Sequence, residues 1–179
     1  MARAPRNAGP RERKELPPLD EAALERLALR YVEKFATSRG KLADYLKRKL
    51  RERGGAGDAA AIAERMAERG YVDDDAYAEA RARGLARKGL GERRVTQDLR
   101  QAGIDEDGIA RATEDASPVD TALAFARRRR IGPFARDVPD PKTREKQIAA
   151  LVRAGHPYSL ARRIADLPPG ADPAALAED

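Results

Sequence analysis

The five-residue pattern Leu-x-x-x-Gly occurs three times, at intervals of about 50 residues, and it limits the folds that this chain can adopt. The three copies are Leu50–Gly54 (LRERG), Leu99–Gly103 (LRQAG) and Leu151–Gly155 (LVRAG). Glycine often ends a helix because it adopts the left-handed backbone conformation without strain. The recurrence therefore predicts an array of repeated helical units.

Apolar residues at helical intervals lie in the segments around each copy. Leu24, Leu27 and Tyr31 share one helical face in the first unit, and a third helix follows the Gly-rich linker. A unit of this size is too small for an independent core, so neighbours should pack end to end. We expect an all-α fold of three tandem three-helix repeats forming an elongated array that can curve, with units at about 20–70, 73–115 and 117–167.

Aromatic residues make up only 4% of the chain and Trp is absent, so the cores should rest mainly on aliphatic contacts. Tyr31, Phe35 and Tyr45 fall on the apolar stripes of the first unit. We therefore expect these three rings in the core and not as base-stacking platforms.

Three segments lie outside this plan. Residues 1–19 are expected to form a disordered basic arm, because their prolines interrupt any helix. The Pro-rich segment 131–142 is expected to be a long exposed loop, and residues 168–179 a flexible acidic tail.

The sequence contains no run of roughly 18 apolar residues that could span a membrane. We expect a cytoplasmic monomer without a membrane partner.

Asp73, Asp74 and Asp75 resemble a cation site at first sight. A hard cation needs further oxygen ligands converging from elsewhere, and the neighbouring sequence does not have the spacing of a calcium-binding loop. We interpret the run as a helix N-terminus instead, with one aspartate capping free N–H groups and the others favoured by the helix dipole.

The glycines that follow do not form a phosphate loop. Gly89 and Gly91 are too few for a dinucleotide fingerprint and follow a helix rather than a strand. We predict a tight corner there, with Gly89 ending one helix and Gly91 starting the next. Gly84 falls inside the preceding helix, which indicates either a close helix contact or a local weakness.

Catalytic chemistry finds little support in the residue inventory. The chain contains no cysteine and a single histidine, His156, which excludes thiolate sites and histidine-clustered metal sites. We predict no enzyme activity, no cofactor and no metal site.

Positive charge is concentrated in blocks, within a formal net charge of +6. Residues 39–53 and residues 81–100 each carry seven cations against two carboxylates, which leaves +5 in each block. Such blocks are compatible with a merely solvated face, but their recurrence in stacked units can line one continuous surface for a polyanion or an acidic protein. The candidate contact residues are Arg48, Arg51, Arg87, Lys88, Arg93, Arg94 and Arg100.

The stretch from Gly70 to Ala78 (GYVDDDAYA) resembles the Gly-Tyr-aliphatic-Asp-Asp-x-x-aromatic-Ala signature of the RecX regulatory proteins. The segment from Lys88 to Gly103 is similar to that family's Gly-x-Gly and Leu-x-x-x-Gly pattern. The resemblance extends over about 20–167, and it is most specific in the second unit. The residues that we assign to an inter-unit structural motif are Gly70, Tyr71, Asp74, Tyr77, Gly89, Gly91, Leu99 and Gly103.

The resemblance implies a non-enzymatic regulator of the RecA recombinase. It implies binding to RecA filaments on single-stranded DNA, with inhibition of ATP hydrolysis, strand exchange and the co-protease activity behind the SOS response. The alternative is a stand-alone helical protein that binds nucleic acid directly through its basic helix faces.

Overall fold

The computed structural model describes residues 17–176, and over this range it contains nine α-helices, two short 3-10 helices and no strand. The predicted all-α fold is confirmed. In chain order the α-helices are α1 (Glu21–Val32), α2 (Arg39–Arg53), α3 (Ala59–Glu68), α4 (Asp74–Arg87), α5 (Glu92–Gln101), α6 (Glu106–Thr113), α7 (Pro118–Arg129), α8 (Pro141–Arg153) and α9 (Tyr158–Asp166). The 3-10 helices are η1 (Gly132–Phe134) and η2 (Pro173–Leu176). The expected disordered arm lies outside the described residues, except for residues 17–19.

Short polar side chains fix where most of the helices begin. Seven N-cap residues accept a hydrogen bond from a backbone N–H of the first turn, which satisfies a group that the helix itself leaves free. These N-caps are Asp20, Ser38, Asp58, Asp73, Asp105, Ser117 and Asp140.

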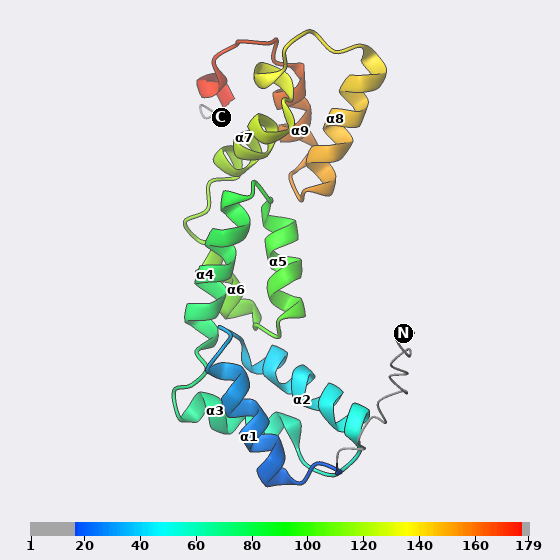
Figure 1. Cartoon of the computed structure of the whole chain (residues 1–179). Helices are drawn as coiled ribbons and strands as arrows, with labels where there is room; N and C mark the ends of the chain where they lie inside the picture. The colour runs from blue at the N-terminus through cyan, green and yellow to red at the C-terminus, as the bar shows by residue number, and fades with distance from the viewer. Residues whose placement is uncertain (1–16, 177–179) are drawn as a thin grey trace, which may run out of the picture.

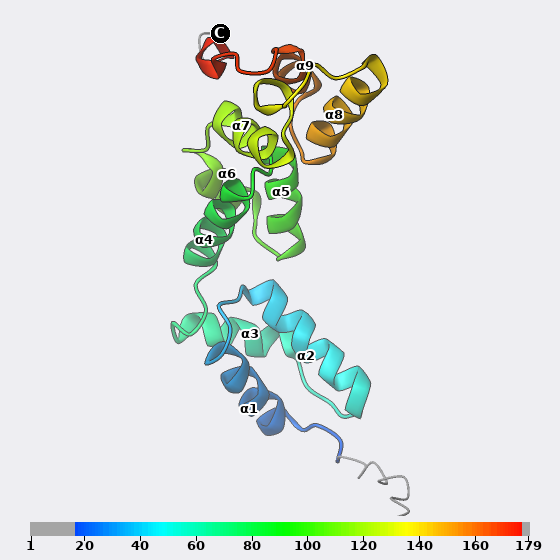
Figure 2. The same cartoon turned by 45° about the horizontal axis from the view of Figure 1, so that its top comes forward.

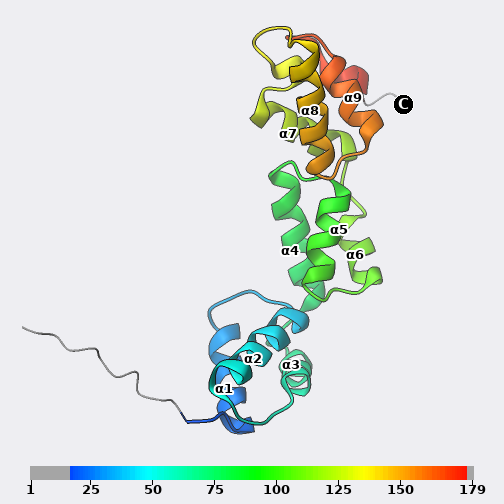
Figure 3. The same ribbon diagram turned by 90° about the vertical axis from the view of Figure 1, so that its right-hand side faces the viewer.

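The helices form three groups of three that follow one another along an elongated body (Figure 1). Unit one contains α1 to α3, unit two α4 to α6, and unit three α7 to α9. The views in Figures 2 and 3 show the same succession from other sides. The predicted array of three-helix repeats is thus confirmed.

Each unit has its own small apolar core. Leu24, Leu46 and Met66 are fully buried in unit one, Leu99 in unit two and Ile164 in unit three. Alanines supply many of the remaining buried positions, which lets the short helices approach closely. Because each core is small, the contacts between neighbouring units should contribute much of the stability of the array.

Phe35 departs from its predicted place in the core. Phe35 is 55% exposed, and it lies three residues beyond Val32, where α1 ends. Tyr31 and Tyr45 are half-buried and pack against the core of unit one. The prediction was therefore wrong for Phe35. The apolar spacing typical of a helix extends to Phe35 in the sequence, but α1 itself ends at Val32.

The Pro-rich segment 131–142 is not a fully exposed loop. Ile131, Gly132 and Pro133 are buried under α9, and Asp140 and Pro141 already begin α8. The expected flexible tail also packs in part, because Leu176 is buried in the core of unit three. Apolar burial explains both departures, since each segment carries an apolar residue that fills the otherwise thin core of unit three.

Candidate polyanion-binding surface

The second helices of the three units meet end to end, at two contacts that we call joint one and joint two. In joint one the start of α2 meets the end of α5. The Ser38 hydroxyl donates to the carbonyl oxygen of Ala102, and Gly40 lies against Gly103. A Cβ atom added at Gly40 would lie 2.6 Å from the Ala102 oxygen, closer than side chains tolerate. Gly40 must therefore be a glycine, because the backbones of units one and two touch at this point.

Joint two repeats this arrangement one unit further along. The start of α5 meets the end of α8, where the Gly91 N–H donates to the Ala154 carbonyl oxygen over 2.9 Å. A Cβ at Gly91 would lie 2.6 Å from the Gly155 carbonyl carbon. A Cβ at Gly89 would lie 2.4 Å from the backbone nitrogen of Phe125 in α7. The glycines that resembled a phosphate loop thus bring two units into backbone contact.

The three aspartates divide between capping and ion pairing. Asp73 caps α4, with its carboxylate 2.9 Å from the Ala76 N–H, as one of the three was expected to do. Asp74 accepts from the backbone N–H and the guanidinium of Arg39, at 2.8 and 2.9 Å, and so ties unit two to unit one. This hydrogen-bonded carboxylate also raises the pKa of Arg39. Asp75 pairs with Arg111 of α6 at 2.6 Å.

The other motif residues lie in the core and at helix ends. Leu99 is fully buried in unit two and Tyr77 is half-buried against the same core. Gly70 and Gly103 have φ angles of 74° and 77°, in the left-handed region, and each follows the C-cap residue of its helix, α3 or α5. Tyr71 is 56% exposed.

The structure separates the predicted cations into engaged and free groups. Arg100 donates two hydrogen bonds to Glu106, at 2.7 and 2.8 Å, so its charge is partly neutralised. Arg48 lies 3.7 Å from Glu52 and over the ring of Tyr45. Within residues 17–176 the exposed predicted cations that form no ion pair are Arg51, Arg87, Lys88, Arg93 and Arg94.

A pocket of about 210 Å³ at joint two gathers two of these free cations. Arg93 and Arg94 of α5 line it together with Arg153 of α8, and we call it the arginine pocket. The remaining lining residues are Gln97, Val152 and Gly155, so no carboxylate is present. Arg94 donates to the Gln97 amide oxygen at 3.0 Å. Three guanidinium groups around one concavity suit a phosphate or another multivalent anion.

Sequence reasoning missed Arg153. The signal was available, because Arg153 lies within the third Leu-x-x-x-Gly copy, at the end of a second helix. This signal points to Arg153 only once it is known that the end of α8 meets the start of α5.

Positive charge also surrounds a single carboxylate near joint one. Arg81 donates two hydrogen bonds to Asp98, at 2.6 and 2.8 Å, and these lower the pKa of Asp98. Lys41 of unit one and Arg94 lower it further by their charge. Cations of units one and two therefore act together on this one carboxylate.

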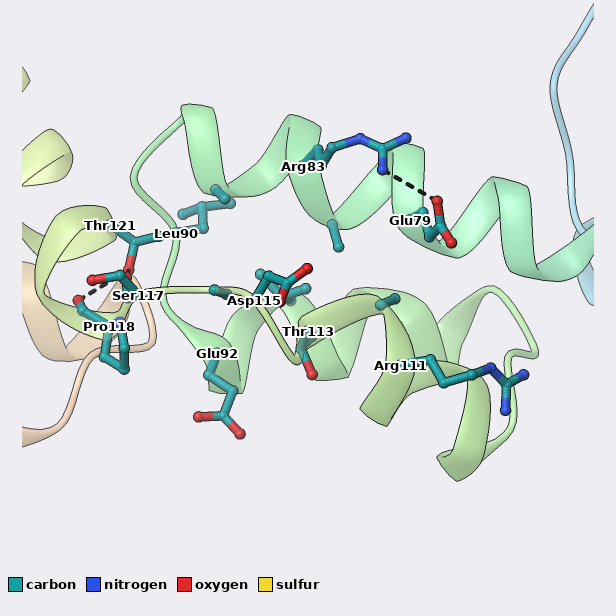
Figure 4. Close-up of a pocket in the computed structure, with 15 residues that line it drawn as sticks. Glu79, Arg83, Leu90, Glu92, Arg111, Thr113, Asp115, Ser117, Pro118 and Thr121 are labelled. Atoms are coloured by element: carbon teal, nitrogen blue, oxygen red, sulfur yellow. Dashed lines mark hydrogen bonds and ion pairs between the residues drawn. The ribbon is translucent and has the colours of Figure 1, made fainter.

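A second cavity, between unit two and the start of unit three, has a different character (Figure 4). It encloses about 360 Å³ between α4, α5, α6 and the start of α7, and its walls combine small apolar side chains with charged ones. Arg83 pairs with Glu79 within it, while Glu92 and Asp115 form no ion pair with any described residue. Its free charges are negative, which opposes polyanion binding there. Residues 17–176 contain no cluster of three or more candidate metal ligands and no helix able to cross a membrane.

Sequence comparison relates the chain to regulatory proteins. A family model described as "RecX, second three-helix domain" matches residues 73–112, which is almost exactly the span of unit two. Regulatory protein RecX of Myxococcus xanthus is 32% identical over 183 aligned residues, covering 90% of this chain and 96% of the relative. The chain belongs to the RecX family.

Further relatives extend this assignment. Regulatory protein RecX of Halorhodospira halophila is 33% identical, over 80% of this chain and 86% of that protein. A crystal structure of a regulatory protein RecX superposes with a TM-score of 0.61 at 24% identity, covering 81% of this chain and 74% of the other. The RecX fold therefore extends through most of the three-unit body, and unit two carries both the family signature and the model match.

Proposed function

We propose that this RecX-family chain regulates the RecA recombinase without catalysing a reaction. In this proposal it binds RecA filaments on single-stranded DNA and inhibits ATP hydrolysis, strand exchange and co-protease activity. Family membership supports the regulatory role. The link to RecA comes from the motif resemblance around Gly70 and Asp74.

The end-to-end order of the second helices is the observation that carries the proposal. It gives one elongated body (Figure 1). Exposed cations that form no ion pair with a described residue recur along it, with Arg51 on α2, Arg93 and Arg94 on α5, and Arg153 on α8. A filament also presents repeated sites, so several weak contacts along such a body combine into strong binding. A surface of this kind suits a filament better than it suits a single small ligand.

The test is a titration of RecA's ATPase on single-stranded DNA. The wild-type chain should lower the ATPase rate at sub-stoichiometric ratios, because one bound molecule can affect several protomers. The triple variant Arg93→Gln, Arg94→Gln, Arg153→Gln should need a much higher concentration for the same effect. An unchanged ATPase rate at every ratio of the wild-type chain contradicts the proposed function.

A matched control removes three charges elsewhere. Arg65, Arg83 and Arg162 are each engaged in an ion pair and do not line the arginine pocket. The triple variant Arg65→Gln, Arg83→Gln, Arg162→Gln has the same net charge as the pocket variant. It should inhibit like the wild type, and equal loss in both variants would refute a role for the arginine pocket.

Direct binding to nucleic acid is the second candidate function. The absence of any carboxylate from the lining of the arginine pocket favours it, because a phosphate group would meet no repulsion there. Affinity for single-stranded DNA measured without RecA should fall steeply with salt. The slope should shrink in the pocket variant, by about 0.7 per lost phosphate contact.

A further inference from the structure

Two large exposed aromatic rings border one cleft where units one and two meet. Phe35 and Tyr71 are 55% and 56% exposed, and both line a depression of about 450 Å³. We call it the aromatic cleft, and its lining residues are Val32, Phe35, Ala36, Thr37, Tyr71, Asp73, Ala76, Tyr77, Ala80 and Arg81. Isolated exposed apolar side chains are ordinary, whereas two rings on one concave surface indicate a binding site.

The backbone holds Tyr71 in this exposed place. Gly70 ends α3 in the left-handed conformation, and the Tyr71 N–H donates back to the Met66 carbonyl oxygen at 2.9 Å. The Gly70 N–H likewise donates to the Ala67 carbonyl oxygen, and α4, α5, α7 and α8 end with the same pair of hydrogen bonds. The residues equivalent to Tyr71 in those caps are Leu90, Ile104, Ile131 and His156.

Tyr71 differs from its four equivalents in exposure. Ile104, Ile131 and His156 are buried, and Leu90 is half-buried. Such a position normally packs an apolar side chain against the end of its own helix. Tyr71 does not pack against the end of α3 in this way, because more than half of the residue is exposed to solvent. Packing of the helix end therefore does not explain why a large aromatic residue stands at this position.

Phe35 is the outer member of a row of three rings. Its centroid lies 5.1 Å from that of Tyr31, and Tyr31 stacks on Tyr45 at 4.3 Å. Arg48 and Lys49 lie over Tyr45 at 5.5 and 5.9 Å. Packing against Tyr31 restrains the Phe35 ring, while its outer side is open to a ligand. A rigid exposed ring loses little conformational entropy on binding.

Polar and cationic groups complete the cleft. Thr37, Tyr77 and Asp73 place hydroxyl and carboxylate groups among its lining residues. Arg81 lines it too and is bound to Asp98 by two hydrogen bonds, and Lys41 and Arg94 are further cations whose charge acts on that carboxylate. Apolar faces, hydrogen-bonding groups and an adjoining positive surface thus occur at one place.

We propose that the aromatic cleft binds an unpaired nucleobase of a single-stranded nucleic acid. The base packs against both Phe35 and Tyr71, and the flanking phosphates contact the cations around Asp98. A base has a flat apolar face, polar edges and a neighbouring negative charge, and the cleft offers a counterpart to each. An apolar side chain of a partner protein would use the rings and leave the cationic group without a counterpart. This inference deepens the proposed binding to a nucleoprotein and rests on it for the source of the strand.

The experiment uses the full chain and an oligonucleotide with one 2-aminopurine, in the absence of RecA. Stacking on an aromatic ring quenches this fluorescent base, so the wild-type chain should quench it on binding. Phe35→Ala and Tyr71→Ala should each weaken binding by about 10-fold, since one base–aromatic stack contributes roughly that much. Their salt dependence should match the wild type, because no charge is removed.

Three controls keep the result specific. Tyr71→Phe retains the ring and should bind like the wild type. Tyr158→Ala removes a ring that is 61% exposed but does not line the cleft, and it should have no effect. Circular dichroism should give the same helix content for every variant, because the substituted side chains are more than half exposed.

Two outcomes overturn the inference. The first is binding of the oligonucleotide without quenching, or no binding at all, by the wild-type chain. The second is loss of RecA inhibition in Phe35→Ala and Tyr71→Ala with unchanged affinity for the oligonucleotide, which would assign the cleft to a protein side chain. Quenching by a wild-type chain that leaves RecA's ATPase untouched would contradict the proposed function alone.

Discussion

His156 of unit three and Gly89 of unit two are joined by a hydrogen bond of 3.0 Å across joint two. The carbonyl oxygen of Gly89 can only accept, so the imidazole donates from Nε2 and is neutral with its lone pair on Nδ1. That Nδ1 atom is buried and has no hydrogen-bond partner among the described residues. Burial lowers the pKa of His156 below its ordinary value of 6.5, because a proton on Nδ1 would meet no acceptor.

Stability should therefore fall in mild acid. The unfolded chain takes up a proton at His156 near pH 6.5, and the folded chain does so only at lower pH. Below pH 6.5 the unfolded state binds more protons, so the free energy of unfolding decreases as the pH falls toward the folded pKa. Thermal unfolding between pH 7.5 and pH 5.5 measures this. His156→Gln removes the chain's only histidine and should show a smaller loss across that range, and an equal loss would refute the prediction.

Substitution of Gly40 should open joint one. The residue is helical, so alanine would normally stabilise α2 slightly, but its Cβ would lie 2.6 Å from the Ala102 oxygen and 2.8 Å from the Gly103 Cα. Both of those atoms are backbone and cannot move aside cheaply. Gly40→Ala should enlarge the radius of gyration in small-angle X-ray scattering while helix content stays constant. Unchanged dimensions would mean that joint one tolerates the methyl group.

Gly84→Ala is the matched comparison and should stabilise the protein. The nearest atom to an added Cβ is a guanidinium nitrogen of Arg87 at 3.9 Å, so no close helix contact exists there. Of the two interpretations of Gly84, the structure thus favours a local weakness. Alanine should raise the free energy of unfolding by about 0.5–1 kcal/mol, as measured by urea denaturation.

The three aspartates should differ in what their replacement costs. Asp73→Ala removes the cap of α4 and should cost about 1 kcal/mol. Asp75→Ala breaks an exposed ion pair with Arg111 and should cost less than about 1 kcal/mol. Urea denaturation measures both losses in the free energy of unfolding, and each should be the same with and without Mg²⁺. A dependence on Mg²⁺ that disappears in these variants would revive the cation interpretation.

Arg153 and Arg100 should contribute unequally to polyanion binding. Arg153→Gln should weaken affinity for single-stranded DNA and reduce its salt dependence, because Arg153 forms no ion pair within the described residues. Arg100→Gln should have the smaller effect, since Arg100 already donates twice to Glu106. Equal losses would show that the strand displaces Glu106 from Arg100.

The local features of the fold could be predicted from the sequence. Ser38, Asp58 and Ser117 cap the helices that follow them, and Gly54 ends α2, as their residue types favour. Capping residues act on N–H groups two or three positions away, and left-handed glycines on the last carbonyl groups of the same helix. That information is contained in a few neighbouring residues, so one unit can be inferred without knowledge of the next.

The sequence by itself thus determined an all-α array, the number of its units and the basic character of its second helices. Only the tertiary structure decided that Arg100 is engaged, that Arg153 completes the arginine pocket, and that Phe35 and Tyr71 are exposed at one cleft. The physical reason is the sequence separation of the partners. Arg39 and Asp74 are 35 residues apart and His156 and Gly89 are 67 apart, and such contacts exist only once the units have docked.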